Sequence, residues 1–182
     1  MKKILQIVGI LIVLSCGVFA QQKSWKTFSP NDGAWSILAP GIMIPDSKAL
    51  ESPSTVGSYS YSDAKVFFSV IYRDTPKSRL LLGFSKESHI KKVRDNFVKT
   101  NKGQLIKDVE FSNGMGNGRE VYVKIAEGNV IGGESQIDMK YRIHRMRLFF
   151  NKRRFYILLA VLPEKEIDSA EVNNFFNSFV IK

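Results

Sequence analysis

The alternation of apolar and polar positions is most regular between residues 137 and 162. Apolar side chains occupy every second position from Ile137 to Ile143, which is the pattern of a strand with one buried face. After His144 the apolar positions change parity. One inserted residue would cause that change, so we predict a β-bulge near His144 and Arg145.

A polar break divides this region into a β-hairpin. Residues 151–154 are Asn-Lys-Arg-Arg, and the segment 155–162 that follows is almost continuously apolar. A short polar break between two apolar runs indicates a hairpin loop. The unbroken second run predicts a central strand that is covered on both faces and stopped by Pro163.

The remaining chain shows further strand patterns and two helix patterns. The segment 86–102 carries a narrow apolar stripe, with Ser85 as a candidate N-cap and Gly103 at its end. The segment 164–178 can be capped by Asp168 or Ser169. Its aromatic stripe indicates packing in a core. Further strands are predicted at 25–28, 35–39, 56–61, 66–72, 104–111 and 119–127, with a loop over 42–55 and another over 112–118.

These elements predict a single α+β domain over residues 21–182. We expect a twisted antiparallel β-sheet of about six to eight strands, flanked by two main helices in an α/β/α sandwich. The apolar core must stabilise this domain without a disulfide, because Cys16 is the only cysteine in the chain. No internal repeat or second domain boundary is visible.

The first twenty residues have the layout of a signal peptide. Lys2 and Lys3 precede an apolar stretch, residues 4–14, that is too short to be a good membrane span. Small residues at the end of this region favour cleavage after Ala20. We therefore expect residues 1–20 to be a signal peptide and the domain to be exported, to the periplasm or outside the cell.

A lipoprotein is the alternative reading of the same region. Residues 13–16, Val-Leu-Ser-Cys, resemble a bacterial lipobox, in which Cys16 would carry the lipid and hold the protein at a membrane. Leu14 stands where smaller residues are commoner, and residues 17–20 are apolar where a lipoprotein usually has a polar tether. Both routes place the folded part outside the cytoplasm.

The charge of the chain restricts its partners without defining its function. The formal net charge is +10, and loss of residues 1–20 leaves 25 basic residues against 17 acidic ones, or +8. Such a protein is attracted to anionic lipids, lipopolysaccharide or cell-wall polyanions. We expect an unknown protein or an anionic envelope component as the partner. Nucleic acid is a weak candidate, since no aromatic signature of RNA binding is present.

The sequence contains no motif that indicates an enzyme. His89 and His144 are the only histidines and have no cysteine or carboxylate at zinc-ligand spacing. The glycine-rich segment 114–118 precedes a predicted strand, whereas a phosphate-binding loop precedes a helix. We expect no catalytic residue, cofactor or metal. The alternative is a small-ligand or hydrolytic enzyme with a pocket near the loop 41–55.

The strongest functional indication is a cluster of cations on the predicted hairpin of residues 137–162. Charged residues of one parity on a half-buried hairpin project together into solvent, where they could bind phosphate or carboxylate groups. An ordinary solvated sheet face is the other interpretation. The residues are Lys140, Arg142, His144, Arg145, Arg147, Lys152, Arg153 and Arg154.

Two terminal motifs resemble those of the PsbP-like, Mog-like superfamily. The first is Trp25 to Pro30 followed by Gly33 to Pro40, in which Trp35 stands where phenylalanine is usual; the second is Phe175 to Ile181. The resemblance covers nearly all of residues 25–181 but rests on structural motifs. It implies an antiparallel sheet between helices and a non-enzymatic binding or accessory domain, and it transfers no functional residue.

Overall fold

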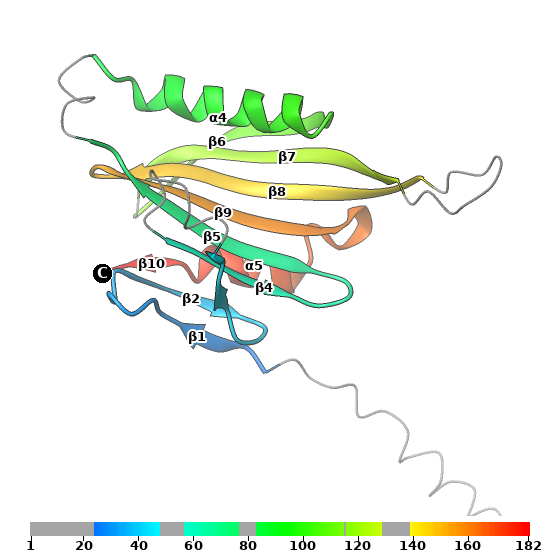
Figure 1. The fold of residues 1–182 in the computed structure, drawn as a ribbon, viewed down its shortest axis with the longest axis horizontal. Helices are drawn as coiled ribbons and strands as arrows, with labels where there is room; N and C mark the ends of the chain where they lie inside the picture. Colours follow the sequence, from blue (N-terminus) through cyan, green and yellow to red (C-terminus); the bar gives the residue numbers. More distant parts are fainter. Residues whose placement is uncertain (1–23, 48–56, 77–82, 115, 129–138) are drawn as a thin grey trace, which may run out of the picture.

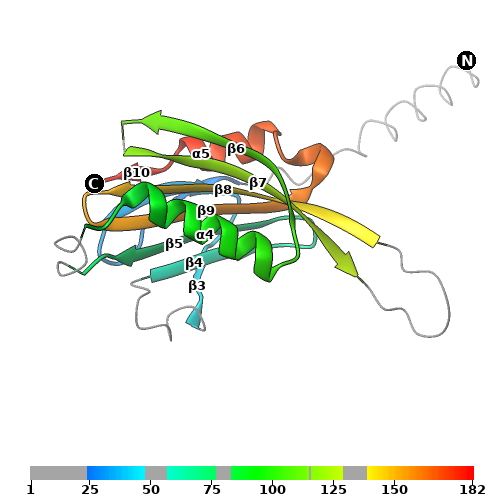
Figure 2. The same cartoon turned by 90° about the horizontal axis from the view of Figure 1, so that it is seen from above.

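The computed structural model describes residues 24–47, 57–76, 83–114, 116–128 and 139–182. These residues form a layered α+β domain (Figure 1). The helix α4 (Lys86–Thr100) covers one face of a long twisted sheet, and the helix α5 (Ala170–Asn177) covers the other together with a small second sheet (Figures 1 and 2). The predicted α/β/α arrangement and fold class are confirmed. No described helix is long and apolar enough to cross a lipid bilayer.

The main sheet has seven strands, all paired antiparallel, in the order β3-β4-β5-β9-β8-β7-β6. The strand β9 occupies the central position and has core residues on both faces, as its continuous apolar sequence predicts. The bounds are β3 Ile44–Pro45, β4 Gly57–Ser62, β5 Phe67–Asp74, β6 Gln104–Asn113, β7 Gly116–Gly128, β8 Met139–Asn151 and β9 Arg154–Pro163.

The predicted bulge near His144 and Arg145 is wrong. The strand β8 keeps one register with β7 and with β9 through both residues. The apolar positions change parity because both faces of β8 are covered: Ile143 and Phe149 belong to the core on the α5 side, and Met146 to the core on the α4 side. The described sheet departs from regular register in β6, at residues 105–107.

The helix α4 begins at the predicted cap and ends two residues before its predicted end. The Ser85 hydroxyl accepts a hydrogen bond from the Ser88 amide. At the other end, Lys102 has a positive φ of 49°, and the Gly103 amide donates to the Val98 carbonyl at 2.9 Å. This is a Schellman ending with a lysine in the left-handed position. A Cβ atom at residue 103 would meet Val123 at 2.5 Å, so glycine permits the close approach to β7.

The opposite face of the sheet carries the larger core. The strand β2 (Trp35–Ala39) pairs antiparallel with β1 (Lys26–Phe28) and β10 (Val180–Ile181), which makes a three-stranded sheet. The C-terminal helix starts later than predicted, because Glu164–Glu166 form a separate 3-10 turn, η1, and Ser169 caps α5. The predicted aromatic stripe is fully buried: Val172, Phe175, Phe176 and Phe179.

Two predicted loops contain more strand than expected. Ile44 and Pro45, predicted to lie in a loop, pair with β4, although residues 48–56 are outside the described ranges. The strands β6 and β7 extend into the predicted loop 112–118, since Asn113 pairs with Gly116. The predicted signal peptide and Cys16 also lie outside the described residues.

Candidate functional site

Two of the cations predicted to face solvent are instead packed against α5. Arg145 and Arg147 lie on the same face of β8 as Ile143 and Phe149. Only 4% of the surface of Arg145 is exposed to solvent. The side chain of Arg147 is 13% exposed. The expectation that the cluster shares one solvent-exposed face is therefore wrong for these two arginines, because α5 covers the face from which they project.

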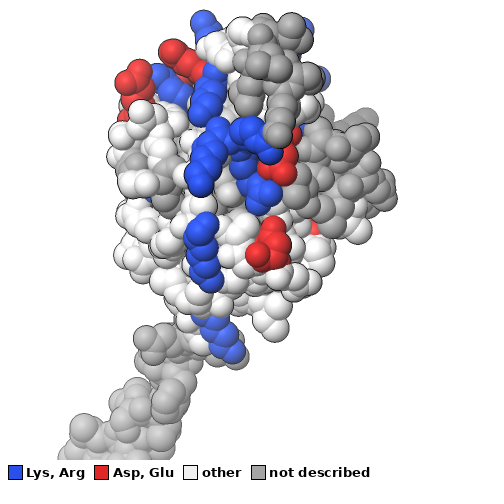
Figure 3. Space-filling view, turned by 90° about the vertical axis from the view of Figure 1, so that its left-hand side faces the viewer, with Lys and Arg blue, Asp and Glu red and all other residues white. Residues whose placement is uncertain are grey.

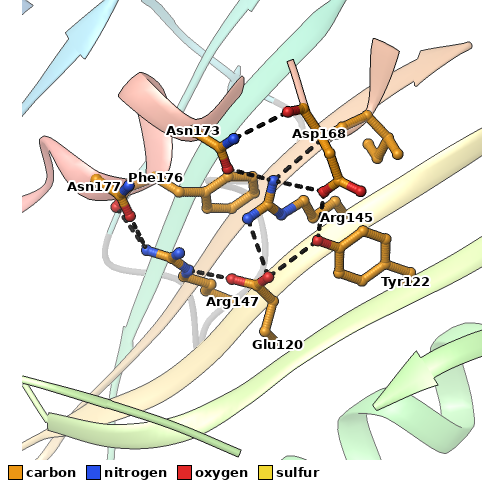
Figure 4. A network of polar contacts seen from close by, with 9 residues as sticks. Glu120, Tyr122, Arg145, Arg147, Asp168, Asn173, Phe176 and Asn177 are labelled. Atoms are coloured by element: carbon orange, nitrogen blue, oxygen red, sulfur yellow. Dashed lines mark hydrogen bonds and ion pairs between the residues drawn. The ribbon is translucent and has the colours of Figure 1, made fainter. Parts of the chain in front are cut away.

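Glu120 on β7 holds both guanidinium groups (Figure 4). Its Oε1 atom accepts from Nη2 of Arg145 at 3.0 Å, and its Oε2 atom accepts from Nε of Arg147 at 2.5 Å. Burial raises the pKa of this carboxyl group, but the hydrogen bond from Arg147 and the charge of Arg145 outweigh burial and hold the pKa of Glu120 below its usual value. Glu120 therefore remains ionised between two cations.

The same two arginines fasten α5 to the sheet. Nη1 of Arg145 donates to the Ile167 carbonyl at 3.2 Å and to Oδ1 of Asn173 at 2.9 Å, both near the start of the helix. Nη1 of Arg147 donates to the Phe176 carbonyl at 3.1 Å, where a positive charge stabilises the C-terminal end of a helix. The Phe176 ring lies between the guanidinium groups, at 4.8 Å from one and 5.2 Å from the other.

Tyr122 and Asp168 complete this network. The Tyr122 hydroxyl lies 3.1 Å from Oε1 of Glu120 and 2.8 Å from Oδ1 of Asp168, so its single proton is shared between two carboxylates. Burial and these acidic neighbours raise the pKa of Tyr122 well above its usual value. The negative charges of Glu120 and Asp168 balance the positive charges of Arg145 and Arg147. The network is neutral and structural, and it offers little free charge to a partner.

Sequence reasoning did not find Glu120 or Tyr122. The available signal was a carboxylate near the middle of β7, next to a strand that carries two arginines of one parity. A carboxylate in such a position is expected to pair with a buried cation. Asp168 was considered as a helix cap, but the structure gives that role to Ser169.

His144 lies on the other face of β8, beneath α4. Its ring centroid is 5.6 Å from that of Phe97, and no described residue forms a hydrogen bond with its buried Nδ1 atom. Burial lowers the pKa of His144 to about 4; Arg142 adds to the lowering and Glu127 opposes it. This histidine is therefore neutral and partly buried beneath α4, separated from the other members of the predicted cluster.

His144 should make the domain less stable in mild acid. The unfolded chain takes up a proton near pH 6.5 and the folded chain only near pH 4, so the free energy of unfolding falls as the pH drops through this window. We expect a loss of about 1 kcal/mol between pH 7 and pH 5, after allowance for partial exposure. Urea unfolding at the two pH values measures this loss.

Two non-titrating variants test the assignment. His144→Gln keeps the approximate size of the side chain, and His144→Phe keeps its aromatic contact with Phe97. Whatever the absolute stability of the two variants, their free energies of unfolding should depend less on pH between pH 7 and pH 5. An unchanged slope in both variants would assign the acid sensitivity to other groups.

Three more members of the predicted cluster lie at different places on the sheet. Nε of Arg142 donates to Glu127 at 2.9 Å, and Lys140 is exposed opposite Glu127 in the β7–β8 register. Nε of Arg154 donates to Asp74 at 2.7 Å, and this pairing raises the pKa of Arg154 despite its partial burial. The structure therefore separates Lys140 and Arg142 from the β8–β9 turn and leaves Arg154 neutralised.

The other two members, Lys152 and Arg153, belong to a group of exposed cations at one end of the sheet. Figure 3 shows Lys and Arg side chains in a row across this end. Within the described ranges, no carboxylate forms an ion pair with any member of the group. We call this surface the basic end, and its members are Arg73, Lys86, Lys152, Arg153 and Lys182.

Strand pairing and the start of α4 bring these cations together. The end of β5 lies beside the β8–β9 turn, where the Thr75 amide donates to the Arg153 carbonyl at 2.9 Å. Nζ of Lys86 lies 5.7 Å from the centroid of the Phe150 ring. Phe150 is near the end of β8, next to the β8–β9 turn. The C-terminus lies at the same end (Figure 1). The basic end is thus assembled from four separate parts of the chain.

Two adjoining hollows lie between the first half of α4 and the strands β6 and β7, and Lys86 lines one of them. Their volumes are about 460 and 540 Å³, and they share Glu87, Ile90 and Arg119. Residues 41–47 line neither of them, and the rest of the loop considered for an enzyme pocket is outside the described ranges. In the part of the chain that the structure describes, no three His, Cys, Asp or Glu side chains gather as a metal site.

The two arginines of these hollows share one aspartate, and each also pairs with a second carboxylate, Asp95 for Arg94 and Glu110 for Arg119. Arg94 on α4 forms an ion pair with Asp108 on β6, and Nε of Arg119 donates to the same carboxylate at 2.7 Å. Burial raises the pKa of Asp108, but the two arginines outweigh burial and hold this pKa below its usual value. The Arg94–Asp108–Arg119 group therefore ties α4 to the edge of the sheet.

Comparison with known proteins supports the fold. No protein-family model and no curated protein sequence matches the chain. The solution structure of cyanobacterial PsbP (CyanoP) from Synechocystis sp. PCC 6803 matches with a TM-score of 0.56 and 14% identity, over 91% of this chain and 96% of that one. The Saccharomyces cerevisiae Ran-binding protein Mog1p matches with a TM-score of 0.48 and 14% identity, over 87% and 96%. The chain has the PsbP-like fold, as the resemblance implied.

Proposed function

We propose that this protein is an exported, non-catalytic binding domain with a PsbP-like fold, and that its basic end docks on an anionic component of the bacterial envelope. The observation that carries the proposal is the distribution of cations. Arg145, Arg147 and Arg154 are neutralised by carboxylates, whereas the five members of the basic end are exposed without such partners in the described ranges. Five free cations from four parts of the chain meet at this end, and such an array favours an anionic surface as the partner.

The shape of the basic end favours a surface over a small ligand. Its cations stand on a hairpin turn, a strand end, a helix start and the C-terminus. Of its five members, only Lys86 lines either of the two hollows. Three members are lysines, which act as flexible point charges and suit a diffuse array of phosphates. Anionic phospholipid headgroups provide such an array, with about 1 kcal/mol per cation close to the surface.

Binding of the mature chain to lipid vesicles tests this proposal. We expect co-sedimentation with vesicles that contain phosphatidylglycerol, little with phosphatidylcholine alone, and weaker binding as salt shortens the range of electrostatic attraction. The variant Arg73→Gln/Lys152→Gln/Arg153→Gln/Lys182→Gln should lose about 4 kcal/mol of binding energy, or roughly a thousandfold in partitioning.

The helix α4 and the turn that follows it supply a control with the same loss of charge. Lys91→Gln/Lys92→Gln/Lys99→Gln/Lys102→Gln also removes four exposed cations, but from a different surface. This variant should retain most of the vesicle binding. Equal losses in the two variants would mean that net charge, and not the basic end, determines binding, and no binding by the unmodified protein would reject a lipid partner.

Export and lipid attachment require a separate measurement, since Cys16 is outside the described residues. The intact mass of protein isolated from cells distinguishes cleavage after Ala20 from a diacylglyceryl group on Cys16. A full-length mass with an intact N-terminus would contradict both forms of export.

A further inference from the structure

The strand β6 is an exposed edge of the main sheet. It is ten residues long, and within the described ranges β7 is the only strand that pairs with it. Three of the exposed large apolar side chains belong to it, Leu105, Ile106 and Val109 at 40%, 50% and 40% exposure. Its register is irregular at residues 105–107 and regular from Lys107 to Asn113. A long, partly apolar edge is a template for an added strand.

The two sides of this edge differ in chemistry. Val109 and Phe111 face the α5 side, where the Phe111 ring contacts Phe149 at 5.7 Å between centroids. Asp108 and Glu110 face the α4 side, beside the hollow of about 540 Å³ that Glu110 helps to line. Asp108 is neutralised by arginines, whereas the Glu110 side chain is 83% exposed. The edge thus offers two apolar contacts, next to Lys107, on one side and an accessible carboxylate on the other.

A second copy of this chain fits the edge poorly. Two β6 strands paired antiparallel about a two-fold axis place residues of equal parity opposite each other. A central register therefore sets Glu110, the exposed carboxylate of this edge, directly opposite the Glu110 of the other copy. Like charges directly opposite each other are destabilising, and the high net charge of the chain adds further repulsion. The edge therefore favours a segment from a different protein.

We propose that β6 binds an extended peptide segment of a partner protein as an added strand along residues 107–113. The apolar side chains of the peptide, at alternate positions, pack beside Val109 and Phe111. A lysine or arginine of the peptide lies opposite Glu110, with room in the adjoining hollow. Backbone hydrogen bonds to the free edge hold the segment, and the alternating side chains select it. This site is independent of the basic end.

Selection from a library of random linear 12-residue peptides, with the full mature chain as bait, tests the proposal. We expect enriched peptides with apolar residues at every second position and a basic residue among them. Val109→Lys should weaken binding of these peptides about tenfold or more, because it places a charge against their apolar side. Glu110→Lys should change the selected preference from a basic to an acidic residue.

A matched control and three outcomes decide the matter. Val180→Lys changes another exposed valine, at 52% exposure on β10, and should leave peptide binding unchanged. Thermal unfolding of each variant confirms that it is folded. No enrichment of peptides above an unrelated bait would overturn the proposal. Enriched peptides that bind Val109→Lys and Glu110→Lys as tightly as the unmodified protein would also overturn it. Sedimentation that shows a dimer lost in Val109→Lys would assign the edge to a second copy instead.

Discussion

Replacement of Glu120 by alanine is expected to lower the free energy of unfolding by about 3–5 kcal/mol. The carboxylate accepts hydrogen bonds from Arg145 and Arg147, and its removal leaves two largely buried guanidinium groups without their central anion. An unpaired buried charge is costly because the surroundings cannot solvate it. Urea unfolding monitored by tryptophan fluorescence measures the change.

Glu110 provides the matched control. It also contacts an arginine, Arg119, at 3.3 Å, but its side chain is 83% exposed. Glu110→Ala should therefore change the free energy of unfolding by less than about 1 kcal/mol. Glu120→Gln, a milder change, allows a double-mutant cycle with Arg145→Met, in which we expect a coupling of about 1–3 kcal/mol. Similar losses for the two glutamates would contradict the central role of Glu120.

Replacement of Trp35 by alanine should also cost about 3–5 kcal/mol. Trp35 is fully buried at the start of β2 and joins the small sheet to the main core. The loss would be a large share of the free energy of unfolding of a typical domain, about 5–15 kcal/mol. The urea concentration at the midpoint of unfolding should therefore fall strongly. Its ring contacts are with Phe28, Tyr59, Tyr72 and Phe179.

Phenylalanine at position 35 should be far better tolerated. The buried Nε1 atom of Trp35 has no hydrogen-bond partner among the described residues. Trp35→Phe removes this unsatisfied donor, whose burial costs about 1–3 kcal/mol, while it opens a small cavity. We expect a net change within about 1.5 kcal/mol. A loss as large as that of Trp35→Ala would show that the indole, and not aromatic packing in general, holds the core.

The sequence predicted the elements well because their signals are local. Alternation located the hairpin of β8 and β9, and the continuous apolar run placed β9 at the centre of the sheet. Ser85 marked the start of α4 through its side chain alone. The 3-10 turn before α5 was not predicted, because helical periodicity does not separate a short turn from the helix that follows it.

The arginines of β8 show where pattern reading fails. A charged residue at alternating positions indicates solvent only when one face of the sheet is open, and α5 covers the face that Arg145 and Arg147 occupy. Their partner, Glu120, lies on the neighbouring strand, 25 residues from Arg145 in the sequence. Pairing over such a separation is set by tertiary structure, so the pattern alone suggested a bulge where the strand is regular.

The candidate site was only partly predictable for the same reason. Lys152 and Arg153 adjoin each other in the sequence and were identified as part of a basic cluster. Arg73, Lys86 and Lys182 reach the same end only through the pairing of β5 with β9, the packing of α4 and the docking of the C-terminal strand. The clustering of basic residues in the sequence therefore identified the cations of the β8–β9 turn but not the other cations of the basic end.

The position of the bound surface tests the proposed function most directly. Amide NMR signals of the mature chain can be recorded with and without nanodiscs that contain phosphatidylglycerol. Docking through the basic end predicts that attenuation is strongest at residues 73–75, at Lys86, at residues 152–153 and at Lys182. Attenuation that is strongest along Lys91, Lys92 and Lys99 of α4, or that is uniform over the surface, would contradict the account.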